Sequence, residues 1–368
     1  MGNSKKTLWL VLAVGLIALA AAVFIGGRSD SGTGMDHMAA GVAINDGNPA
    51  EFKDGVIALD PATIGLAFRH FVDRADASWE EIQPTADGQP LFDKLDRYGD
   101  KDYGIHDTYA DIQPEAGRQQ LNDLTEEHGF GRPFGEPFKS DQVGVASIVD
   151  KKMFWHKGDA KESILYREAD GDRAYEAVGF YLEEDNQAHF SVYRPPGFSE
   201  PVIRIAADPA KSEGVQNYMW VTELPDDARP SFNSLFEIVQ RAIVATDSSS
   251  SVKRESSETI ASVTMPQLDE VEYERDLEEL IGMGISTKYE VSEAFQKVRV
   301  SVDELGAEAA ALTGLVISVT SLPPPDPREH IILGDQGNLL IWFTEEGSDL
   351  PICIMLTNPE AWTEARSD

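Results

Sequence analysis

The sequence predicts an α+β protein with a substantial core. Strand-like and helix-like stretches are mixed along the 368 residues without a regular alternation of strand and helix, which is typical of α+β folds. A hydrophobic fraction of 42% is sufficient for a packed interior. No internal repeat is visible, which excludes solenoids and propellers. The length suits one large domain or two small ones.

The N-terminal stretch 7–26 is an uncharged apolar run long enough to cross a bilayer once. Lys5 and Lys6 precede it, so we expect the N-terminus to stay cytoplasmic and the rest of the chain to be exported. Because apolar residues continue to Ile25, an uncleaved transmembrane anchor over 1–27 is preferred to a cleaved signal peptide. The expected location is therefore membrane-anchored with the domain periplasmic or extracellular, and secretion after signal cleavage is the alternative.

The next segment, 28–50, is rich in Gly, Ser, Asp, Asn and Ala and predicts a flexible linker between the membrane and the domain. The main domain is expected over 51–363, followed by a short tail, 364–368. Within the domain, apolar residues at helical spacing predict helices over 115–127 and 232–244.

The charge and the motifs exclude several classes of function. A net charge of −33 makes nucleic acid an improbable partner, because phosphate binding needs a basic face. The sequence contains no G-x-S-x-G, H-E-x-x-H or P-loop motif, and the S-x-x-K match at Ser250–Lys253 lies in a polar patch without a helix start. The histidines are scattered, and Cys353, as the single cysteine, can form no intrachain disulfide. We therefore expect no enzyme, no catalytic residue, no metal and no cofactor.

The most informative stretch begins at Asp303 and continues to the proline run 323–325. Its left flank, 297–302, alternates apolar and polar residues, as a half-buried strand does. Read with a period of two, the residues from 307 to 319 present one face without any charge. That face consists of Ala307, Ala309, Ala311, Thr313, Leu315, Ile317 and Val319. The pattern suits an exposed loop that can become a buried strand.

An Ala-rich helix is the alternative for this stretch, because alanine favours helices. Gly314 and the β-branched residues after it weaken that interpretation. The only charge in the run, Glu308, lies on the face opposite the apolar one.

The segment 304–313 resembles the hinge and reactive loop of the serpins, the serine protease inhibitor family. Further similarities are spread over the domain. The stretch 56–68 resembles the entry to the central buried helix. The stretch 265–286 resembles a family segment upstream of the hinge, and 291–297 resembles the segment that leads into the strand before the hinge. The stretches 338–343 and 350–359 resemble the closing strand pair. The stretches 177–182 and 190–196 resemble a paired hairpin of the family.

The resemblance implies a serpin-like α+β fold: a large mixed β-sheet plus smaller sheets, helices packed at one end, and an exposed reactive loop near the C-terminus. It places the reactive bond between Thr320 and Ser321. It assigns the hinge to Glu304, Gly306, Ala307, Glu308, Ala309, Ala310, Ala311 and Thr313, and the inserting loop to Leu315, Ile317 and Val319.

The function implied is inhibition of a serine-type endopeptidase by a bait loop that inserts into the sheet after cleavage. The small bait residues indicate elastase-like or subtilisin-like proteases, and the inhibitor is expected to be a monomer. A non-inhibitory binding or scaffold protein with the same fold is the alternative. Two departures from the family pattern favour this alternative: Asp60 stands where the family has a buried serine, and 83–109 is expected to be too short and polar for the usual helices.

Overall fold

The computed structural model describes residues 38–39, 42–43, 49–74, 77–98, 107–111, 114–135, 144–148, 153–167, 173–184, 186–211, 216–247, 254–255, 257–285, 289–291, 294–307 and 327–365. The predicted anchor, 7–26, lies outside these ranges. No helix within them is long and apolar enough to cross a membrane. Part of the predicted linker is structured, because β1 (Met38–Ala39) pairs with β2 (Val42–Ala43) and Val42 is buried in the core.

The largest sheet has seven strands and is antiparallel throughout. Its strands, in spatial order, are β13 (Arg254–Glu255), β10 (Phe190–Tyr193), β11 (Val202–Ala206), β12 (Asn217–Pro225), β21 (Gly337–Glu345), β22 (Ile354–Thr357) and β3 (Val56–Leu59). The β21–β22 pair is the closing strand pair that the sequence predicted. At its centre Trp220 and Trp342 stack with ring centroids 5.9 Å apart.

The central strands of this sheet are buried on both faces, so apolar residues occupy most of their positions. Along β3, Ile57 and Leu59 belong to the core on one face, whereas Val56 and Ala58 belong to the core on the other. Alternate residues of a strand point to opposite faces, and both sets are therefore hydrophobic here.

A four-stranded sheet contains the parallel pairing. Its order is β20 (Glu329–Ile332), β14 (Ile260–Pro266), β9 (Arg173–Tyr181) and β8 (Ala160–Arg167), with β14 and β20 parallel. The predicted hairpin between 177–182 and 190–196 is wrong. The first segment, β9, pairs with β8 and β14, whereas the second, β10, pairs with β11 and β13 in the other sheet. Asn186 stabilises the turn that follows β9. Its side chain accepts a hydrogen bond from the Glu183 amide and donates one to the Tyr181 carbonyl.

The third sheet holds the segment of functional interest. Its order is β15 (Leu268–Asp276), β18 (Phe295–Val302), β19 (Gly306–Ala307) and β7 (Met153–Phe154), all antiparallel. The remaining strands form two small sheets, β17 (Tyr289–Glu290) with β16 (Gly284–Ile285) and β4 (Ile82–Gln83), and β5 (Asp107–Asp111) with β6 (Gly144–Ile148).

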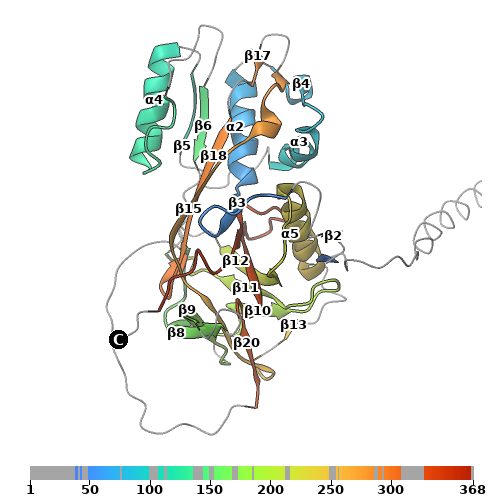
Figure 1. Cartoon of the computed structure of the whole chain (residues 1–368), viewed down its shortest axis with the longest axis vertical. Helices are drawn as coiled ribbons and strands as arrows, with labels where there is room; N and C mark the ends of the chain where they lie inside the picture. Colours follow the sequence, from blue (N-terminus) through green and yellow to red (C-terminus); the bar gives the residue numbers. More distant parts are fainter. Residues whose placement is uncertain are drawn as a thin grey trace, which may run out of the picture. The chain divides into compact units, whose positions relative to one another are not determined.

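Among the described residues the helices are α2 (Pro61–Arg74), α3 (Gln89–Leu95), α4 (Pro114–Glu127) and α5 (Phe232–Asp247), with short 3-10 turns at Trp79–Glu81, Asp96–Tyr98 and Glu278–Leu280. Both helices predicted from periodicity are present as α4 and α5. Figure 1 shows α2, α3 and α4 gathered near β18, and α5 beside the seven-stranded sheet. The α+β class is confirmed.

The stretch 83–109, which was expected to be too short and polar for the family's usual helices, does hold a short helix, α3. Pro90 occupies its first turn, where a missing N–H costs little. Leu91, Phe92 and Leu95 are buried on one face of the helix, and the Trp79 ring stacks on Phe92 at 4.9 Å. Burial of these three side chains therefore stabilises a short helix whose other face is polar.

Candidate functional site

The candidate site is the position where β19 lies between β18 and β7. Val302 of β18 pairs with Ala307 on one side, and Met153 and Phe154 of β7 pair with Ala307 and Gly306 on the other. We call this arrangement of β18, β19 and β7 the hinge site. It means that the first residues of the predicted loop already form a strand inside a sheet, with neighbours on both edges.

A tight turn connects β18 to β19. The Asp303 carboxylate accepts hydrogen bonds from the amides of Leu305 (2.8 Å) and Gly306 (2.9 Å), and the Asp303 amide donates to the Gly306 carbonyl (2.9 Å). Burial raises the pKa of the Asp303 carboxyl group, and the two amide bonds oppose this effect. Aspartate is favoured in such turns because its side chain can bond the backbone two residues on.

Trp155, directly after β7, binds the same turn from the other side. Its indole N–H donates to the Asp303 carbonyl (2.8 Å), and its backbone amide donates to the Leu305 carbonyl (3.1 Å). The ring is almost fully buried and packs edge-on against Phe180. The turn is therefore attached to the body of the protein at two points.

Gly306 is required by the close approach of β7. A Cβ atom on this residue would overlap the carbonyl group of Met153. Glycine is the residue that allows two backbones to come this close.

The two faces of β18 differ in character. Gln296, Val298 and Val302 are buried, whereas Lys297 and Arg299 are only partly buried and form ion pairs with Glu274 (2.6 Å) and Glu270 (3.3 Å). The even-numbered residues of β18 therefore face the core. A strand that pairs with β18 would have apolar neighbours on one face of the sheet and charged neighbours on the other.

At the opposite end of β18 from Val302, Asp60 joins the N-terminus of α2 to β18. Its carboxylate accepts from the Thr63 amide (2.9 Å), and the side-chain amide of Gln296 bonds to both its backbone N–H (3.0 Å) and its carbonyl (2.7 Å). Burial raises the pKa of Asp60 to about 7, against the opposing bonds from Thr63 and Ala62.

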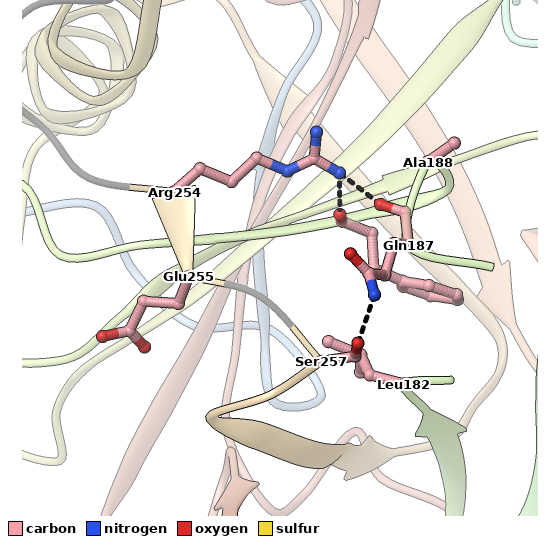
Figure 2. Close-up of a pocket in the computed structure, with 7 residues that line it drawn as sticks. Leu182, Gln187, Ala188, Arg254, Glu255 and Ser257 are labelled. Atoms are coloured by element: carbon pink, nitrogen blue, oxygen red, sulfur yellow. Dashed lines mark hydrogen bonds between the residues drawn. The ribbon is translucent and has the colours of Figure 1, made fainter. Parts of the chain in front are cut away.

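At the other end of the loop, Arg328 donates to the carbonyls of Leu182 (3.1 Å) and Ser257 (2.8 Å) just before β20 begins. These two residues help to line a cavity of about 230 Å³, together with Gln187, Ala188, Phe190, Arg254 and Glu255. Figure 2 shows Arg254 and Gln187 engaged with protein groups around it. We assign this cavity no ligand.

Of the predicted hinge residues, the structure brings Gly306 and Ala307 into β19 and places Glu304 in the turn before them. The remaining predicted residues lie outside the described residues. They are Glu308, Ala309, Ala310, Ala311, Thr313, Leu315, Ile317, Val319, Thr320 and Ser321.

Three residues of this region were not assigned a role from the sequence: Asp303, Trp155 and Gln296. The spacing of Asp303 and Gly306 was a usable signal for a tight turn. Trp155 and Gln296 lie far from the turn along the chain, and no local pattern identifies them. Within the described ranges no group of His, Cys, Asp and Glu is arranged to hold a metal ion.

No protein-family model matches the sequence. No curated protein matches it either. Similar solved structures include the native state of the thermophilic serpin tengpin, with 13% identity, 84% of this chain and 89% of that chain covered, and a TM-score of 0.47. Human glycosylated kallistatin has 11% identity, with 85% and 93% of the chains covered and a TM-score of 0.45. Maspin has 13% identity, with 83% and 93% covered and a TM-score of 0.45.

Proposed function

We propose that this protein inhibits serine-type endopeptidases by offering 308–326 as a bait loop and inserting the cleaved loop beside β18. The observation that carries the proposal is β19, which is the start of such an inserted strand. The reacting serine belongs to the target protease, which attacks the bait bond and forms an acyl-enzyme. The inhibitor contributes the subsequent strand insertion.

The register of β19 defines which residues would become neighbours. Starting from Val302 and Ala307, each step of two residues brings Ala309 opposite Val300 and Ala311 opposite Val298. Paired residues in antiparallel strands share a face. The odd-numbered loop residues would therefore lie on the side of β18 that is buried, and Glu308 would lie on the charged side.

The other edge of the inserted strand has a partner as well. Continuing the pairing of Ala307 with Met153 without a bulge brings 312–316 alongside 144–148, the residues of β6. The thirteen residues 307–319 would span roughly 44 Å as a strand. Burial of Leu315, Ile317 and Val319 would contribute about 1.5–3 kcal/mol each.

The small residues of the hinge suit this function because a strand that enters a closed sheet must pass between packed side chains. A charge on the core-facing side would have to be buried without a partner, which is strongly unfavourable. The same charge on the opposite side would meet Arg299 or Lys297.

This difference supplies a matched pair of variants. Ala309→Glu places a carboxylate on the core-facing side, whereas Ala310→Glu places it opposite Arg299. We expect Ala309→Glu to be cleaved as a substrate and to lose most of its denaturant-resistant conjugate with the protease, and Ala310→Glu to retain the conjugate. The measurement is gel electrophoresis after incubation with elastase-like and subtilisin-like proteases.

The outcomes of this experiment separate the two functions under consideration. If no protease of the panel forms a conjugate with the wild-type domain, inhibition by trapping is wrong and a non-inhibitory binding or scaffold role is favoured. Equal conjugate from both variants would contradict insertion in the observed register. The hydrogen bonds of Asp60 to Gln296 are the observation that favours the non-inhibitory alternative, because they hold β18 in place.

We further propose that Thr320–Ser321 is the bait bond, since its small hydroxyl side chains suit elastase-like or subtilisin-like specificity pockets. We also propose that 7–26 anchors a monomeric inhibitor to the membrane with its domain exported, secretion after signal cleavage being the alternative. Mass spectrometry of the cleaved loop identifies the bond.

A further inference from the structure

Asp60 occupies a junction between two parts of the protein. It lies directly after the last residue of β3 and directly before the first residue of α2, and only 7% of its surface is exposed. Its carboxylate accepts the Thr63 amide in the first turn of α2, as a helix N-cap does. The residue therefore organises the start of a buried helix.

Gln296 connects this helix start to β18. Its side-chain amide accepts from the Asp60 backbone N–H (3.0 Å) and donates to the Asp60 carbonyl (2.7 Å) and the Thr63 hydroxyl (3.1 Å). All three bonds join residues more than 200 positions apart in the sequence. They attach the first residues of β18 to the N-terminus of α2.

α2 also contacts β5 and β6. α2 is thus an element that is shared by β18, through the Asp60–Gln296 bonds, and by this strand pair. Any separation of β18 from α2 must break the Asp60–Gln296 bonds and bring water to Asp60.

We propose that Asp60 is a pH-dependent lock on β18: its neutral carboxyl group keeps the junction with α2 closed, and its ionisation favours the opening of that junction. The consequence for loop insertion rests on the proposed inhibitory function. The opening of β18 itself does not depend on that function.

The electrostatic surroundings of Asp60 support the lock. Burial raises its pKa to about 7, so ionisation occurs near neutrality while the junction is closed. The groups that contact the carboxyl group or its backbone are the amides of Ala62 and Thr63 and the Thr63 hydroxyl, all of α2, and the Gln296 amide of β18. The Cys353 thiol, before β22, is close enough for Asp60 to raise its pKa further, after burial, and it therefore stays neutral in this pH range.

The direction of the effect comes from a comparison of the two states. When the junction opens, water reaches Asp60 and its pKa falls toward the ordinary value of 3.8. The open form is then favoured increasingly as the pH rises from about 4 to 7, by at most about tenfold per pH unit, and no further above 7. Mild acid closes the lock, and neutral pH releases it.

Hydrogen–deuterium exchange of the β18 amides tests the proposal on the intact chain. After correction for the pH dependence of intrinsic exchange, we expect the protection of β18 in the wild type to fall by roughly tenfold or more between pH 5 and 7. Asp60→Asn keeps an oxygen acceptor for Thr63 but cannot ionise, so its protection of β18 should not change with pH. Glu223→Gln is the matched control, because Glu223 has a pKa of about 7 but binds a different turn, at Gly334 and Gln336.

Protection of β18 that is independent of pH in the wild type would overturn the lock, and so would an Asp60→Asn variant that keeps the wild-type pH dependence. Asp60→Ser serves the same purpose if Asp60→Asn does not fold, since serine is also an N-cap residue that does not ionise in this range.

A synthetic peptide of residues 307–319 then measures insertion separately. If this peptide never binds but β18 protection depends on Asp60, the lock is supported and the insertion is not.

Discussion

At the scale of single residues, the hinge site depends on backbone contact more than on side-chain chemistry. Gly306 lies so close to the Met153 carbonyl that any Cβ atom would overlap it. Asp303 and Trp155 then hold the turn with hydrogen bonds of 2.8–3.1 Å. The position of β19 is therefore controlled by one glycine and two fixed partners.

Gly306→Ala should displace β19 from between β18 and β7, because Met153 cannot retreat without moving a buried strand. We expect a loss of about 1–3 kcal/mol in unfolding free energy, as for overpacking elsewhere, measured by urea denaturation. Trp155 fluorescence should change in parallel, since the indole N–H loses its partner in the turn. Gly135→Ala is the control, because nothing lies within 4 Å of its Cβ position and its φ angle is not positive. A Gly306→Ala protein with wild-type stability would contradict the importance of this contact.

At the scale of elements, the sequence predicted where strands lie but not which strands pair with each other. The alternation in 297–302 predicted a strand, and β18 is there. The family resemblance of 338–343 and 350–359 predicted the pair β21–β22. The same kind of resemblance in 177–182 and 190–196 led to a wrong hairpin, because the apolar residues of a segment show that a strand is buried but do not identify the neighbouring strand.

Cleavage of the loop supplies a prediction at this scale. If the freed segment completes the strand begun by β19, nicking within 308–326 should raise the melting temperature by about 10 °C or more, given burial of three apolar side chains. Calorimetry before and after limited proteolysis measures the shift. The Ala309→Glu variant should show little rise after the same nick, because its carboxylate blocks the core-facing side. An unchanged melting temperature for the nicked wild type would show that the strand does not enter.

At the scale of the whole molecule, two buried carboxyl groups influence stability in the same direction. Burial is the main cause of a pKa of about 7 for both Asp60 and Glu223, and Glu200 and Asp335 add to the effect at Glu223. A folded pKa above the unfolded value means that stability is greatest below the unfolded pKa and declines as the pH rises through the folded one. For Glu223 this window runs from the ordinary value of 4.5 to about 7.

We therefore expect the unfolding free energy of the wild type to fall between pH 4.5 and 7, with Glu223 responsible for up to roughly 3 kcal/mol. Glu223→Gln should fall less over this range when both proteins are measured by denaturant titration. Glu360→Gln, which removes the same charge at an exposed position, should match the wild type and so corrects for general repulsion in a chain of net charge −33. Parallel curves for Glu223→Gln and the wild type would exclude the assigned role of Glu223.

The sequence by itself determined the α+β class, the strand before the hinge and the helices α4 and α5, because these depend on local periodicity and composition, and its family resemblance predicted the closing strand pair. It also indicated that the hinge is small and uncharged on one face. Only the tertiary structure decided that β9 and β10 belong to different sheets, that α3 is stabilised by contacts such as the Trp79 stack on Phe92, and that Asp60 is buried against Gln296. These features arise from contacts between residues distant in the chain, and burial of a side chain is set by everything that packs around it rather than by its neighbours in sequence.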